Sequence, residues 1–130
     1  MQDPDTPILA IKDEDAERPV ASAWRPTLRD IVKAFVQGDY ALECGIDSVA
    51  PVSAATADHI KAYIADYGET LIELPEETWS TSVSLWMGSH WDVIVDLWTA
   101  ESGQSDMILQ VRVTETGNGF GIDIHMVYVP

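Results

Sequence analysis

Acidic side chains between residues 92 and 106 are the first candidates for chemistry in this sequence. Asp92 and Asp96 stand four positions apart in an alternating apolar run, Trp91–Thr99. On a strand they would face the same way about 13 Å apart, too far for direct acid–base pairing. Asp96 and Asp106 form the closer pair, across a predicted hairpin, and such like charges need a cation or a donor beside them. Carboxylates at loop ends more often accept turn N–H bonds, so we predict no catalytic residue.

No metal, nucleophile or cofactor pattern is complete. Four oxygen donors fall close together in the sequence: Asp96, Glu101, Ser105 and Asp106. Their spacing does not follow an EF-hand loop, and the scattered histidines form no zinc motif. The single cysteine, Cys44, lies among acidic residues, which raise a thiol pKa. We therefore predict neither a metal site nor a cofactor.

The charge balance restricts the partners. The chain carries 22 acidic and 7 basic residues, a net charge of −15. Between residues 62 and 130, Arg112 is the one basic residue against eleven acidic ones. Nucleic acids and anionic membranes need lysine and arginine, so neither is an expected partner. A basic protein or a cation would be attracted, although excess acid can also serve only to keep a protein soluble.

Cysteine usage and hydropathy indicate a compartment. One cysteine cannot form an internal disulfide, which fits a reducing environment. The acidic beginning of the chain does not resemble a secretory signal, and no apolar run approaches the ~20 residues of a membrane helix. We expect a cytoplasmic protein.

Composition divides the chain into a tail and a domain. Residues 1–23 are rich in acidic residues and proline, and we predict an acidic, flexible tail there. One apolar run, residues 8–11, interrupts it and could add a strand to a sheet edge or dock on a neighbour. Residues 24–130 are predicted to form a single α+β domain.

Two helices are predicted first. Thr27-x-x-Asp30 resembles a capping box and opens an apolar stripe that Gly38 ends. The second helix runs from about Ala54 to Tyr67. The first stripe contains Leu28, Ile31, Val32, Phe35 and Val36.

Alternation with period two follows from residue 69 onward. The apolar runs cover about residues 70–74, 78–87, 91–99, 106–113 and 120–128, joined by short turns. This order predicts an α+β fold with two N-terminal helices packed on one face of a four- to five-stranded antiparallel meander sheet. The predicted core face contains Val83, Leu85, Trp91, Val93, Val95, Leu97, Leu109, Val111, Val113, Ile122, Ile124 and Met126.

The second sheet face mixes large apolar and charged side chains. Alternation places Trp86, Ile94, Trp98 and Ile108 there beside several carboxylates, Arg112 and His125. Such a face indicates a binding surface, unless the tail, the 39–52 loop or a second copy of the chain covers it. The predicted binding residues are Trp86, Asp96, Trp98, Glu101 and Asp106.

The sequence also resembles a family of small, uncharacterised bacterial proteins. The resemblance covers about residues 24–130 and implies no catalytic residues. The features are Asp66-Tyr67-Gly68, Leu71, Leu74-Pro75, Trp79, Val95-Asp96-Leu97-Trp98-Thr99, Glu101-x-Gly103-x-Ser105-Asp106 and Tyr128-Val129-Pro130. A weaker resemblance is to the cystatin-like roll of the nuclear-transport-factor-two superfamily, through the run from Ala34 to Tyr40. That fold implies a pocket between helices and a curved sheet.

Together these features favour a non-enzymatic acidic protein-binding module of immunity or accessory type, a monomer or homodimer with a basic protein partner. The alternative is an enzyme or small-molecule binder with a pocket between helices and sheet. That pocket would be lined by Phe35, Tyr63, Tyr67 and Trp91, with Asp96 or Asp106 at its mouth. A third option is a structural homodimer that packs its mixed sheet faces together.

Overall fold

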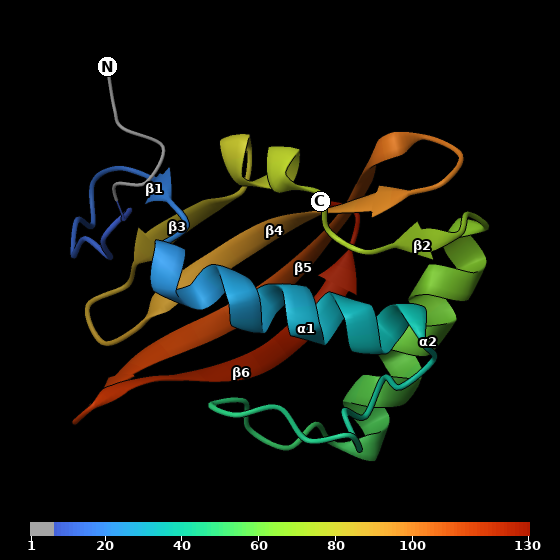
Figure 1. The fold of residues 1–130 in the computed structure, drawn as a ribbon, viewed down its shortest axis with the longest axis horizontal. Coiled ribbons are helices and arrows are strands. Elements are labelled where there is room, and N and C mark those ends of the chain that lie inside the picture. Colours follow the sequence, from blue (N-terminus) through green and yellow to red (C-terminus); the bar gives the residue numbers. More distant parts are fainter. Residues whose placement is uncertain (1–6) are drawn as a thin grey trace.

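Apolar side chains repeat with a helical period before Gly68 and alternate after it, and the computed structural model follows this change (Figure 1). The structure describes residues 7–130, and in this part of the chain it has two α-helices and a six-stranded antiparallel sheet. The sheet order is β1-β3-β4-β5-β6, and β2 also pairs with β4. The elements are β1 (Arg18–Pro19), η1 (Ser22–Trp24), α1 (Arg25–Val36), α2 (Ala54–Tyr67), β2 (Leu71–Ile72), η2 (Glu76–Ser80), β3 (Val83–Trp86), β4 (Trp91–Thr99), β5 (Gly103–Thr116) and β6 (Gly119–Tyr128).

The two predicted helices are confirmed, with a different beginning for the first. Helix α1 follows directly from η1 with Pro26 in its first turn, so Thr27 does not cap it. Helix α2 begins where Ser53 Oγ accepts the Thr56 N–H (3.1 Å) and ends at Gly68, which has a φ of 83°.

The helices differ in how they meet the sheet. Figure 1 shows α1 crossing one face of the sheet. Helix α2 lies near the C-terminal end of α1 and runs at a steep angle to α1. Helix α2 contacts β6, and Ile60 and Ile64 still reach the same core as Leu28 and Phe35. The expected α+β class and antiparallel sheet are therefore confirmed. The sheet has six strands and not four to five, because β1 was not predicted, and it is not a simple meander, because β2 pairs with β4 and not with β3.

The core face of β3 is the reverse of the prediction. Ser84 lies opposite Val93 and Trp86 opposite Trp91, so these side chains point toward the helices, while Val83 and Leu85 point to the other face. Ser84 is only 2% exposed. Its hydroxyl can be buried because it donates to the carbonyls of Arg18 and Pro19 in β1. Alternation of apolar residues assigns a serine to the solvent side, so it cannot predict a serine that is buried through hydrogen bonds to backbone.

A β-bulge in β6 corrects a second core assignment. Val111 lies opposite Ile124 and Gln110 opposite Met126, which leaves His125 as an extra residue. The bulge turns Met126 to the outer side and brings Val127, fully buried at 0%, into the core. The remaining predicted core residues of β4 and β5 are buried: Trp91, Val93, Val95, Leu97, Leu109, Val111 and Val113.

The segment before η1 packs more closely than its composition suggests. Residues 1–6 of the predicted tail lie outside the described residues. Strand β1 pairs with β3, and Val20 and Ala21 are buried at 0% and 2%. Residues 8–11 do not form a strand. The flexibility expected of residues 1–23 stays a prediction.

Candidate functional site

The sheet face turned away from α1, called the outer face here, is built by the register of five strands. Side chains that pair directly across antiparallel strands point to the same side of a sheet. Four rows of the outer face span three or more strands: Leu85–Asp92–Arg112–Asp123, Val83–Ile94–Gln110–Met126, Asp96–Ile108–Tyr128 and Ile72–Trp98–Gln104.

Apolar side chains occupy the middle of this face. Ile108 is only 5% exposed, although it does not belong to the core cluster beneath the helices. The apolar side chains in its own row and in the rows that begin with Leu85 and Val83 are half-buried and also lie outside that cluster: Tyr128, Val83, Ile94, Met126 and Leu85. Helix α2 borders these side chains at Met126, which lines a hollow with Ala55 and His59. Because the group lies outside the core cluster, the sheet keeps an apolar band on its outer face.

Charged groups border the band. Three carboxylates, Asp92, Asp96 and Asp123, share the outer face with one guanidinium, Arg112, which gives the face a net charge of −2 (one positive against three negative). Arg112 stands between Asp92 and Asp123 in the register, yet within residues 7–130 it forms no ion pair shorter than 4.0 Å. His90 Nε2 lies 3.3 Å from Asp92 Oδ1.

Asp96 is held in place by hydroxyl groups. Its backbone N–H donates to Ser82 Oγ (3.0 Å), its carbonyl accepts from Thr78 Oγ1 (2.7 Å), and its carboxylate accepts from Thr81 Oγ1. The donor that the sequence analysis required beside this carboxylate is therefore Thr81. A fixed, half-buried carboxylate is suited to recognising a cationic group.

Trp86 and Trp98 do not share a surface. Trp86 lies on the helix side, where its ring centroid is 4.6 Å from that of Trp91 and Lys12 Nζ lies 5.1 Å above it. Trp98 lies on the outer face and packs over the turn, with its ring 3.8 Å from the position of a Cβ at Gly103. Its buried Nε1 has no hydrogen-bond partner among the described residues.

The Glu101 side chain and the Asp106 backbone take part in the fold. The Glu101 carboxylate accepts the Thr70 N–H with both oxygens (2.8 and 3.0 Å), and the Asp106 N–H donates to the Tyr67 hydroxyl (3.1 Å). Asp96 lies opposite Ile108, so the register does not pair Asp96 with Asp106. The stretch that suggested a carboxylate dyad instead builds the β4–β5 turn and anchors α2.

An irregularity in β5 explains the spacing of that stretch. Strand β5 carries extra residues between Gln104 and Ile108, opposite Leu97. Ser105 holds them, because its hydroxyl donates to Leu97 O (2.8 Å) and accepts the Met107 N–H (3.1 Å). This role of Ser105 was not predicted, because alternation of apolar residues gives no signal for extra residues in a strand.

The pocket expected between helices and sheet is filled by the residues proposed to line it. Phe35 and Trp91 are 1% and 3% exposed, and the Tyr63 hydroxyl accepts the Val129 N–H (3.0 Å). An open groove of about 400 Å³ lies elsewhere, between α1 and residues 44–47. Its lining is mostly polar, and it has no buried catalytic pair.

Cys44, which borders this groove, is not an activated nucleophile. Asp39 raises the pKa of the Cys44 thiol, first because its carboxylate accepts a hydrogen bond from the thiol and then, beside desolvation, through its negative charge. A protonated thiol is a poor nucleophile and a poor metal ligand. Within residues 7–130 no group of three or more His, Cys, Asp or Glu side chains could hold a metal ion. In the same range, none of the helices is sufficiently long and apolar to span a membrane.

Comparison with known proteins adds a family but no activity. No curated protein and no solved structure matches the chain. One family model matches residues 32–130. The match begins inside α1, so β1 and η1 lie outside it. The expected kinship with a family that has no assigned activity is thereby confirmed, whereas bacterial origin and the likeness to the nuclear-transport-factor-two superfamily stay predictions. The chain belongs to the family described as a domain of unknown function (DUF7668).

Proposed function

We propose that this protein is a non-enzymatic protein-binding module whose outer face docks a protein partner that presents basic and apolar side chains. The observation that carries the proposal is the apolar band around Ile94 and Ile108, which no described helix covers. Ile94 is only half-buried, so a partner that covers the band would remove more apolar area from water. The site suits recognition more than chemistry because its carboxylates are not neighbours: Arg112 stands between Asp92 and Asp123 in the register, and Asp96 lies in another row.

Charge complementarity selects the kind of partner. Asp92, Asp96 and Asp123 border the band, and the whole chain has a net charge of −15. An acidic partner, including a second copy of this chain, would be repelled, whereas a lysine- or arginine-bearing one would be attracted. We further propose a cytoplasmic, accessory or immunity role, since a single cysteine excludes an internal disulfide.

Two matched peptides test the proposal. A soluble amphipathic peptide of leucine and lysine should bind the chain, and its counterpart of leucine and glutamate should not. Amide chemical shifts should change along the outer-face rows of β3 to β6. The affinity should fall as salt is added, because exposed charge pairs are screened.

A pair of variants locates the contact. Ile94→Asp places a charge in the centre of the apolar band and should weaken binding about tenfold or more. Val36→Asp is the control, because Val36 is 40% exposed on α1, away from the outer face. Equal binding of the glutamate peptide, or loss of binding in Val36→Asp alone, would contradict the proposal. If analytical ultracentrifugation shows a dimer of the free chain that Ile94→Asp dissociates, the partner of the outer face is a second copy of the chain and not a basic protein.

A further inference from the structure

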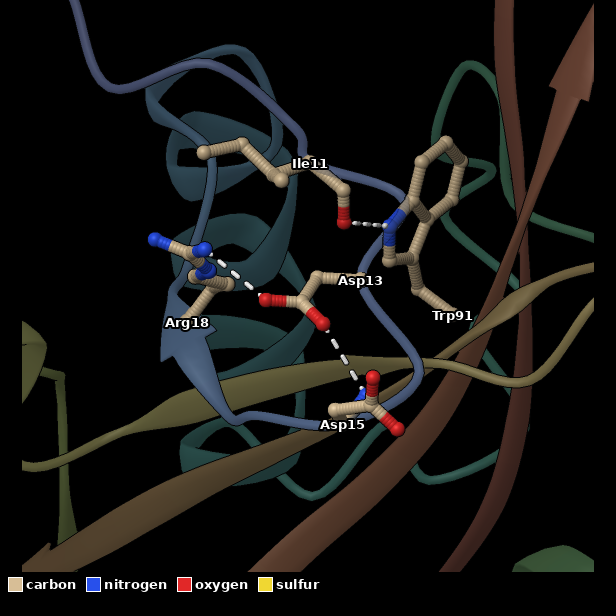
Figure 2. Close-up of polar contacts among 5 residues, drawn as sticks. All are labelled: Ile11, Asp13, Asp15, Arg18 and Trp91. Atoms are coloured by element: carbon tan, nitrogen blue, oxygen red, sulfur yellow. Dashed lines mark hydrogen bonds and ion pairs between the residues drawn. The ribbon is translucent and has the colours of Figure 1, made fainter.

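Residues 8–11 are held against the domain at both ends. The Ile8 N–H donates to Ser22 Oγ (2.7 Å), and the Ile8 carbonyl accepts the Ser22 N–H (2.8 Å). Three residues later, the Ile11 carbonyl accepts the indole N–H of Trp91 (3.0 Å; Figure 2). The segment therefore has a defined position on the helix side of the sheet, at a distance from the outer face.

Between these anchors the side chains face solvent. Leu9 is 71% exposed and Ile11 is 42% exposed. Figure 2 shows that the Ile11 side chain points away from Trp91 while its carbonyl points toward it. The backbone N–H and C=O groups of Leu9 and Ala10 have no hydrogen-bond partner within residues 7–130. The run thus offers two apolar side chains and an unpaired backbone edge.

An acidic turn follows directly. Asp13 fixes this turn, because its carboxylate accepts from Arg18 Nη2 (2.8 Å) and from the Asp15 N–H (2.9 Å; Figure 2). The one base of the segment, Lys12, is already paired with Glu115 (2.8 Å). The acidic side chains that remain next to the apolar run are exposed: Glu14, Asp15 and Glu17.

We propose that residues 8–17 are a docking segment that adds as a strand to the open sheet edge of a protein partner lined with lysine and arginine. Main-chain hydrogen bonds to Leu9 or to Ala10, whose backbone groups lie on opposite edges of an extended run, would give affinity. The side chains of Leu9 and Ile11 would enter apolar pockets. The acidic turn selects a basic partner by charge. Because the anchors at Ile8 and Ile11 already order the run, less entropy is lost on docking. This surface is separate from the outer face and does not depend on its function.

Nuclear magnetic resonance on the full chain tests the proposal with a defined probe. The probe is a soluble peptide of alternating lysine and valine, and the comparison peptide alternates glutamate and valine. We expect the lysine peptide to shift the amide signals of Leu9 and Ala10 and to slow hydrogen exchange at one of the two, as pairing along a single strand edge requires. Comparable binding by the glutamate peptide, or unaltered exchange at both amides, would overturn the proposal.

Substitutions then separate this segment from other surfaces. The double variant Leu9→Ser, Ile11→Ser should raise the dissociation constant about tenfold, while Met87→Ser, which alters another exposed apolar residue (49%), should not. The Trp91 indole signal checks the fold, because the backbone carbonyl of Ile11 is retained. Ile94→Asp should leave the peptide-induced changes at the Leu9 and Ala10 amides as they are. Loss of these changes in Ile94→Asp would contradict binding at this segment. A dimer of the free chain that the double variant abolishes would contradict a basic partner.

Discussion

At the scale of single residues, polar groups near the ends of the sheet serve the fold more than they serve chemistry. Tyr63 and Tyr67 project from α2, and their hydroxyls accept the N–H groups of Val129 and Asp106. Each bond joins α2 to a strand distant in sequence. Because the hydroxyls are acceptors from backbone, these tyrosines cannot be replaced by phenylalanine without leaving a donor unpaired.

Tyr67→Phe tests this role. We expect the free energy of unfolding to fall by about 1 kcal/mol, since one hydrogen bond is lost and the aromatic packing is kept. Urea denaturation measures the change. Tyr40→Phe is the matched control, because the Tyr40 ring stacks on Phe35 with centroids 5.9 Å apart and its hydroxyl forms no bond within the described residues. A Tyr67→Phe protein as stable as the control would exclude this contribution.

Asp39 controls the reactivity of Cys44. The carboxylate accepts the N–H groups of Glu43 and Cys44 (2.8 and 3.0 Å), which lowers the pKa of Asp39, and it raises the pKa of the Cys44 thiol. At pH 8 we expect Cys44 to react with iodoacetamide more slowly than a free cysteine, and Asp39→Asn to accelerate the reaction. An unchanged alkylation rate in Asp39→Asn would show that the neighbouring charge does not govern the thiol.

The same carboxylate predicts an acid-sensitive loop. The folded pKa of Asp39 lies below the ordinary value of 3.8, so its stabilising bonds are complete above that value and are lost as the pH falls through the lowered pKa. Hydrogen exchange of the Glu43 and Cys44 amides, compared at pH 5 and at pH values below 3.8, should show selective loss of protection at low pH. Asp39→Asn should remove this pH dependence, and a protection pattern independent of pH in the unaltered chain would contradict it.

At the scale of elements, the sequence predicted the helices and most strands but not their local irregularities. Long apolar stripes and the Ser53 and Gly68 caps define α2 within one residue because they act locally. The face of β3 depends on Ser84 pairing with β1, which is a long-range contact. The residues of the outer face that alternation missed, Val83, Leu85 and Met126, follow from that inversion and from the β6 bulge.

The bulge in β6 makes a measurable distinction between neighbours. An uninterrupted strand would bury Met126 and expose Val127, whereas the structure buries Val127 completely and places Met126 on the outer face. Val127→Ala should therefore cost about 2 kcal/mol of unfolding free energy through lost burial and a small cavity, and Met126→Ala clearly less. Chemical denaturation of both variants decides the register, because the straight strand requires the opposite order.

At the scale of the whole molecule, net charge and surface ion pairs respond to salt in opposite directions. The chain carries a net charge of −15, whose self-repulsion opposes the compact state and is screened by added salt. The exposed ion pairs Lys12–Glu115, Arg18–Asp13 and Arg29–Glu76 are weakened by the same screening. Because each such pair contributes only about 0–1 kcal/mol, we expect the repulsion to dominate.

The urea midpoint should consequently rise when sodium chloride is increased from low to physiological concentration. Urea is the suitable denaturant, since it carries no charge of its own and leaves the screening to the added salt. Glu73→Gln provides a control: Glu73 is exposed and forms no ion pair within residues 7–130, so the variant removes only one negative charge and its response to salt should be smaller than that of the unaltered chain. A midpoint that falls with salt would mean that the ion pairs outweigh the repulsion. The attraction of basic partners to both proposed surfaces would then have to be attributed to local carboxylates and not to the charge of the whole chain.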